Sequence, residues 1–275
     1  MKVGVCINHG WGKDIDASFK AVADNGMHYC QFVSWIPQLW TDEEAAKINE
    51  ACAKYDVTIT AFWCGWEGPC VWDFYDGQKT LGLVPPEFRE MRIKNLCDGA
   101  DFAKKLGVTD VVTHMGFIPE NPFDPIYPGF LEAVKTVAEY LKKNDQWLLF
   151  ESGQETPATM LRVFEDCGMD NIACNFDTGN VILYGKANPV DAIDVLGKNI
   201  RNIHAKDGLY PTDGKNLGEE VALGTGKANI KEFIRKMHSI GYDGYVIIER
   251  EISGEQQNLD IIAAKELLES VIAEF

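Results

Sequence analysis

The sequence lacks a long apolar run and has few basic residues. No apolar stretch approaches the roughly 18 residues that a membrane-spanning helix needs, and the start, MKVGVCINHG, is too short and too strand-like for a secretory signal. We therefore expect a cytoplasmic protein with no membrane partner. Lys and Arg number 26 against 42 Asp and Glu, and the resulting net charge of −16 repels polyanions. Nucleic acid is accordingly not expected as a partner.

The cysteines offer no metal-binding spacing. There are 8 of them, none in a CxxC pair, and several lie inside apolar runs, where a reduced buried thiol is the ordinary interpretation. A GxGxxG motif is also absent after the first expected strand, which argues against an open dinucleotide-binding sheet. No Gly-rich phosphate loop is evident either, which favours an unphosphorylated ligand.

What the sequence does contain is a regular alternation of two patterns over its 275 residues. Short apolar runs predict strands at 2–8, 27–34, 57–64, 109–115, 146–151, 171–177, 200–206 and 244–250. Amphipathic stretches predict helices at 15–25, 42–55, 86–106, 129–143, 157–167, 189–198, 229–240 and 258–274. Eight βα units without a break in composition predict an α/β fold, a (β/α)8 TIM barrel forming a single domain over 1–275.

Helix starts carry capping signals. Thr41 with Glu44 forms a T-x-x-E capping box, and Asn229 with Glu232 resembles one. Thr156 and Asn188 each precede a proline suited to the first helical turn.

Four polar residues close four successive strands: Glu151, Asp177, His204 and Glu249. A charge at the end of an apolar strand is costly to bury unless it is paired or bound to metal. Each alone reads as an ordinary strand-end residue, but together they predict a site for one divalent metal ion at one end of the barrel. Oxygen ligands with one imidazole suit Mn²⁺, Mg²⁺ or Co²⁺ better than a structural zinc. Ligand chemistry does not separate Mn²⁺, which we take as first choice, from Co²⁺, Mg²⁺ or catalytic Zn²⁺.

Further residues near the same strand ends are candidates for substrate binding. The set is His9, Trp63, Trp66, His114, Asn180, Lys206, Asp207 and Glu251. The aromatic rings would stack on a face of the ligand or simply pack the barrel rim. Lys206 and Asp207, beside His204, would contact a substrate oxygen or orient the histidine, and orientation is the simpler role for Asp207.

Three long loops follow strands three, four and seven, at the barrel end that carries active sites in this architecture. They begin near Gly65, Phe117 and Gly208, and the first two are rich in aromatic residues or proline. Such loops predict either a lid that excludes water from a small polar substrate or a surface that packs against a second subunit.

The chain resembles the sugar phosphate isomerase/epimerase family, the xylose-isomerase-like TIM barrels. The resemblance spans essentially the whole length and is densest in FESGQETP, NFDTGNVILYG, HAKDG, GTGKANIKEFI and GYVIIERE. In ketose 3-epimerases of this family a Glu, an Asp, a His and a second Glu bind one Mn²⁺ or Co²⁺. The resemblance implies these roles for Glu151, Asp177, His204 and Glu249, with the two glutamates exchanging protons with the substrate. It also implies carbohydrate metabolism and a homo-oligomer, either a dimer or a tetramer.

Two positions depart from the epimerase pattern. Asn180 stands where those enzymes have a histidine, and the HAKDG segment lacks the arginine that often follows the strand-seven histidine. The HxKD form is commoner among inosose-dehydratase-like members. AP endonucleases of the same superfamily need further histidines, on strands three and six and in a DxH pair, that this chain does not have.

The resemblance and the residues together predict an isomerase: a metal-dependent epimerase or isomerase acting on a ketose or related keto sugar. Glu151 and Glu249 would serve as acid and base around a metal-stabilised enediolate. A metal-dependent keto-sugar or inosose dehydratase, or lyase, would use the same first step and remains an alternative. The alternative of another class is a non-catalytic sugar-binding barrel, against which the presence of both glutamates argues.

Overall fold

Alternating apolar segments and amphipathic helices close into a barrel. A computed structural model describes all residues, 1–275, and contains eight parallel strands in the closed order β1-β10-β7-β6-β5-β4-β3-β2. The strands are β1 (Lys2–His9), β2 (Tyr29–Ser34), β3 (Thr58–Cys64), β4 (Asp110–Thr113), β5 (Trp147–Glu151), β6 (Ile172–Asp177), β7 (Ile200–Ala205) and β10 (Tyr245–Ile248). The predicted α/β class and the (β/α)8 TIM barrel are confirmed.

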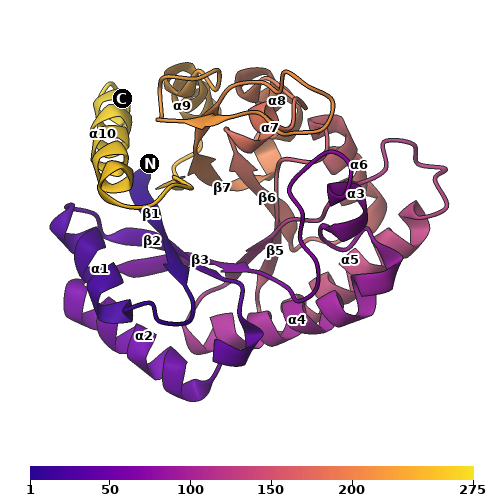
Figure 1. The fold of residues 1–275 in the computed structure, drawn as a ribbon, viewed down its shortest axis with the longest axis horizontal. Helices are drawn as coiled ribbons and strands as arrows, with labels where there is room; N and C mark the ends of the chain where they lie inside the picture. Colours follow the sequence, from indigo (N-terminus) through magenta and orange to yellow (C-terminus); the bar gives the residue numbers. More distant parts are fainter.

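Eight principal helices surround the barrel (Figure 1). They are α1 (Ile15–Asp24), α2 (Asp42–Tyr55), α4 (Pro86–Lys105), α5 (Tyr127–Lys143), α6 (Pro157–Cys167), α8 (Pro189–Leu196), α9 (Ile230–Ser239) and α10 (Glu255–Ile272). Short elements that the sequence analysis did not predict lie in the connections: η1 (Pro37–Leu39), α3 (Gly77–Thr80), α7 (Asn180–Leu183), η2 (Gly197–Asn199), β8 (Asp207–Gly208) and β9 (Glu220–Val221). None of the helices combines the length and the apolar character needed to cross a membrane.

Strand alternation divides the apolar residues into two layers. On β5, Leu148 and Phe150 point outward into a cluster of 56 buried residues between strands and helices. Leu149, between them, points inward into a smaller cluster of 10 buried residues that fills the barrel and its mouth. Glu151 has the same parity as Leu149, and this parity places its carboxylate at the inner end of the strand.

Three of the predicted helix starts have the expected cap. Thr41 and Thr156 accept hydrogen bonds from the backbone N–H three residues on, and Asn188 accepts from Val190 and Asp191. The prediction for Asn229 was wrong. Its φ of 50° places it in the left-handed region, and its side chain caps nothing. An N-cap side chain reaches the first turn only from an extended backbone, so the local turn overrides the sequence pattern here.

The loop after β3 is held over the mouth by a buried arginine of α4. The Arg92 guanidinium donates to the carbonyls of Gly82, 2.6 Å away, Pro69, 2.9 Å away, and Glu67, 3.4 Å away. Its charge is taken out of water without a carboxylate partner, and this burial lowers the pKa of Arg92 to about 10. The carbonyl dipoles therefore replace solvent around the guanidinium.

We expect Arg92→Met to lower the free energy of unfolding by about 2–4 kcal/mol, because three carbonyls of the covering loop lose a charged donor. Urea denaturation measures the change, and limited proteolysis should show faster cleavage between residues 65 and 85. Lys94→Met, an exposed position on the same helix, is the control and should shift stability by less than about 0.5 kcal/mol. Equal effects from both substitutions would contradict this role for Arg92.

Candidate metal centre

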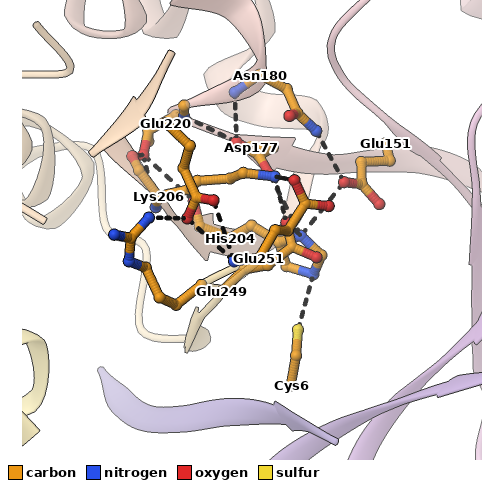
Figure 2. A network of polar contacts seen from close by, with 12 residues as sticks. Cys6, Glu151, Asp177, Asn180, His204, Lys206, Glu220, Glu249 and Glu251 are labelled. Atoms are coloured by element: carbon orange, nitrogen blue, oxygen red, sulfur yellow. Dashed lines mark hydrogen bonds and ion pairs between the residues drawn. The ribbon is translucent and has the colours of Figure 1, made fainter. Parts of the chain in front are cut away.

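Four side chains from adjacent strand ends converge on the barrel axis (Figure 2). Their ligand atoms, from Glu151, Asp177, His204 and Glu249, all lie within 4.8 Å of one another. Parallel pairing produces this meeting, since Asp177 lies directly opposite His204 in the β6–β7 ladder. The Nδ1 of His204 is 3.4 Å from Glu151 Oε1, 3.5 Å from Asp177 Oδ2 and 3.3 Å from Glu249 Oε2.

A residue that the sequence analysis missed fixes the imidazole. Gln31 of β2 places its Oε1 2.6 Å from His204 Nε2, and its Nε2 donates to Asn175 Oδ1 at 3.1 Å. The Nε2–H of His204 is thereby the donor, and the lone pair of Nδ1 is directed at the three carboxylates. A glutamine inside the apolar strand YCQFVS was the available sign, because a buried amide needs a partner.

The donor set fits a divalent cation. Both His204 Nδ1 and Asp177 Oδ2 are buried and make no hydrogen bond, although they lie 3.5 Å apart. Buried polar atoms of this kind are rare unless water or an ion satisfies them. Three carboxylate oxygens and one imidazole nitrogen around the same point are ligands suited to Mn²⁺, Mg²⁺, Co²⁺ or catalytic Zn²⁺.

Protonation of the cluster shows how strongly it attracts positive charge. Burial lowers the pKa of His204, but the charges of Glu249, Cys6 and Glu151 outweigh burial and leave this pKa well above its usual value. Burial raises the pKa of Asp177 to about 7, although Lys206 works against the rise. Burial also acts to raise the pKa of Glu249, but Lys206 and His204 bring it well below the usual range. The cluster therefore favours positive charge at the place where a metal ion would bind.

The two glutamates have different surroundings. Glu151 uses both oxygens: Oε1 accepts from Asn180 Nδ2 at 3.0 Å and lies 3.6 Å from His114 Nε2, and Oε2 accepts from the indole N–H of Trp63. The ion pairs of Glu249 with His204 and Lys206 both use Oε2, and Oε1 takes part in neither. Only one oxygen of Glu249 is thus committed to the cluster.

Lys206 is the cation of the site. It is 1% exposed, and its Nζ lies 3.1 Å from Glu249 Oε2 and 2.8 Å from Glu251 Oε2. Two carboxylates compensate one buried ammonium, which is the arrangement that permits a lysine inside a protein. Lys206 and Glu251, both proposed from the sequence, therefore lie beside Glu249.

A cavity of about 280 Å³ opens above the cluster and is termed here the barrel cavity. One wall is aromatic, with Trp35, Trp63 and Trp72, and the opposite wall carries Glu249 and Glu251. His114, Glu151 and Asn180 complete the lining near the cluster. Trp35 and Trp72 were not among the predicted site residues, because their positions depend on how the loops after β2 and β3 fold.

Three of the residues predicted to bind substrate line neither the cluster nor the barrel cavity. Trp66 is buried behind the aromatic wall, 5.0 Å from the ring of Trp35. His9 contacts Ser34 Oγ and Glu44 Oε1, each at 3.1 Å, on the outer side of β1. The Asp207 carboxylate accepts from four backbone N–H groups at 2.9 Å, those of Gly208, Gly224, Gly226 and Ala228. It holds the loop after β7, which is a structural task beside the metal cluster.

We expect Gln31→Met to weaken Mn²⁺ binding about ten- to a hundredfold, because the imidazole loses the acceptor that sets its tautomer. Titration calorimetry with Mn²⁺ measures the change. Gln31→Glu keeps an acceptor for Nε2–H at the same position and should bind within a few-fold of the wild-type protein. Unchanged affinity in the Met variant would show that Gln31 does not orient His204.

We also expect Mn²⁺ affinity to rise with pH. The metal-free cluster holds a proton on His204 that binding must displace, so each proton released strengthens binding about tenfold per pH unit through the neutral range. Calorimetry in buffers of different ionisation enthalpy should detect release of at least one proton. His28→Gln, at an exposed histidine, is the control and should leave this pH dependence unchanged. Binding that is independent of pH would contradict the protonated metal-free state.

Comparisons with known proteins agree with the geometry. An uncharacterised protein of Methanocaldococcus jannaschii is 26% identical over 196 residues, which are 67% of this chain and 63% of that protein, so this chain spans under two thirds of the curated relative it matches. The structure of a xylose isomerase domain protein from Planctomyces limnophilus is 30% identical, with a TM-score of 0.89 over 98% of this chain and 96% of that one.

A D-tagatose 3-epimerase-like protein shares the fold at 21% identity, with a TM-score of 0.76 over 99% of this chain and 97% of that one. The sequence profile of the xylose isomerase-like TIM barrel family matches residues 19–271, nearly the whole chain. The chain belongs to the xylose isomerase-like TIM barrel family.

Proposed function

We propose that this protein is a divalent-metal-dependent epimerase or isomerase of a ketose or related keto sugar. Glu151, Asp177, His204 and Glu249 would hold the ion, with Mn²⁺ as the first choice. The observation that carries the proposal is the convergence of these four side chains, two of which, Glu151 and Glu249, line a cavity together with three tryptophans and Glu251. When bound, the ion would supply electrophilic stabilisation of the oxygen that gains charge during proton abstraction.

The two glutamates would move the proton. We assign its removal to Oε1 of Glu249, because the other oxygen of that carboxylate is held by Lys206 and His204. The C–H bond next to the carbonyl breaks, the proton forms an O–H bond on Glu249, and the electron pair moves toward the carbonyl oxygen. Glu151, which is charged at rest, would take a proton from solvent and pass it to the opposite face of the carbon, which inverts it.

The remaining residues would bind and shield the sugar. His114 and Asn180 both lie against Glu151 and are placed to contact a hydroxyl group beside the reacting carbon. Trp35, Trp63 and Trp72 would pack against the C–H face of the ring and exclude water. Lys206 would hold Glu249 in place, and Glu251 would in turn hold Lys206.

A dehydratase remains the second candidate because of Lys206. The ammonium lies between Glu249 and Glu251, next to the carboxylate assigned as the base. In this reaction Glu249 takes the proton, the electron pair forms a carbon–carbon double bond, and a proton of Lys206, passed through Glu251 at the cavity wall, goes to the departing β-hydroxyl group, which leaves as water. Absorbance of an enone or diketone product distinguishes this outcome from an epimer.

Hydrogen exchange in D₂O tests the proposal. With Mn²⁺ and a panel of ketoses and keto-cyclitols, we expect deuterium to enter the α position of at least one compound, followed by NMR. Glu151→Gln and Glu249→Gln, each saturated with metal, should slow exchange by at least about a hundredfold. Glu120→Gln, at an exposed loop position, is the matched control and should retain full exchange. Stoichiometric metal binding without exchange of any compound would favour the sugar-binding alternative.

A further inference from the structure

A second recess lies between α1 and α10 and adjoins the barrel cavity. Its volume is about 240 Å³, and it is termed here the α1–α10 recess. Five residues line both spaces: Val5, Cys6, Asn8, Gln257 and Ile261. Because the same side chains border both volumes, the two spaces meet along the end of β1 and the start of α10.

The barrel wall is incomplete where they meet. The β1–β10 ladder ends at the pair Val5 and Ile248, whereas β1 continues to His9 and pairs there only with β2. Beyond Ile248 the chain leaves the wall and turns through Gly254, with a φ of +88°, into α10. Residues Cys6–His9 therefore border an opening that no strand closes. Cys6 Sγ is 3.9 Å from His204 Nε2, which places the opening beside the metal cluster.

The packing of α10 keeps the recess open. Figure 1 shows α1 and α10 on either side of β1. The buried residues of α10, namely Ala264, Leu268 and Val271, all lie in its C-terminal half. In the N-terminal half, Leu259 is 52% exposed. The first turns of α10 therefore do not close against the barrel, and space remains between this helix and α1.

The lining of the recess has no acidic group, one exposed cation and four amide side chains. Although the chain has 42 acidic residues, none lines this recess. Its polar groups are the amides of Asn8, Asn25, Gln257 and Asn258, the Ser18 hydroxyl and one exposed ammonium, Lys13. Asn25 Nδ2 donates to Asn258 Oδ1 at 3.0 Å, so the carbonyl of the first amide and the NH₂ of the second are available to a ligand.

Amides and hydroxyls both donate and accept hydrogen bonds, as sugar hydroxyl groups require. The apolar side chains of Val22 and Ile261 provide a surface for the C–H face of a ring. The barrel cavity alone, at about 280 Å³, lies at the lower end of the roughly 300–1,000 Å³ of small-molecule sites. A single monosaccharide ring suits that cavity, and a second ring requires the adjoining space.

We propose that the α1–α10 recess is a second sugar subsite and that the substrate is a glycosylated keto sugar. The reacting keto unit would lie over the metal cluster, and a neutral glycosyl unit would pass between Asn8 and Gln257 into the recess. The inference rests on the proposed function for the identity of the reacting unit. The test of the second subsite measures binding alone and does not require the enzyme to turn over a substrate.

Titration calorimetry would compare D-fructose with maltulose, leucrose, isomaltulose and lactulose, which between them carry a glycosyl group on O4, O5 or O6 of fructose. Three proteins would be measured, each saturated with Mn²⁺: the wild type, Ala21→Trp and Ala263→Trp. Ala21 is an exposed residue of α1 that lines the recess, and an indole there would fill it. Ala263 is an exposed alanine of α10 outside the recess and provides the matched control. Exchange in D₂O is followed in the same samples.

We expect at least one disaccharide to bind the wild type tenfold or more tightly than D-fructose, which about one or two net hydrogen bonds would provide. Ala21→Trp should abolish that advantage and leave D-fructose binding unchanged, whereas Ala263→Trp should preserve it. Disaccharides that bind no better than D-fructose, or an advantage that survives Ala21→Trp, would overturn the subsite. A recess-dependent advantage without deuterium exchange would retain the subsite and refute the proposed reaction instead.

Discussion

The interaction on which the site depends is the burial of three carboxylates around one imidazole at the end of the barrel. Glu151 is 2% exposed, and Asp177 and His204 are fully buried. Like charges this close repel one another, and leaving one buried charge uncompensated costs several kcal/mol. Positive charge offsets this cost: Lys206 supplies it beside Glu249, the raised pKa of His204 favours a proton on the imidazole, and a divalent ion would supply it when bound. The hydrogen bonds that Trp63 and Asn180 donate to Glu151, and the one that Gln31 accepts from His204, serve this same balance.

The same balance gives the two glutamates unequal roles. Donors from three neighbouring strands or loops hold Glu151, so its position is fixed and its charged form is favoured. Glu249 follows the short strand β10 and is held mainly through Lys206, whose ammonium Glu251 shares. A base needs an oxygen that no donor occupies, and Glu249 provides one. The pair is therefore asymmetric although the two residues are chemically identical.

The sequence alone predicted the barrel and the cluster, for a common physical reason. Strand alternation and parallel pairing are periodic, so an acidic residue closing an apolar run has a defined place, as Glu151 and Asp177 do. Gln31 and Trp72 were not predicted, because their roles depend on which side chains meet across the barrel or from a folded loop. Asp207 illustrates the limit: it follows Lys206 directly, and one step along the chain turns its carboxylate to the loop amides.

The end of β10 connects the chemistry with the shape of the site. A longer β10 would complete its ladder with β1 and seal the wall beside Cys6. On the other side, the backbone N–H of Glu249 still donates to Ala205 O of β7, 3.2 Å away, and Glu249 keeps the parity of Ile247, which pairs with His204. The end of β10 thus keeps Glu249 in the cluster through β7 and leaves the seam with β1 that joins the barrel cavity to the α1–α10 recess.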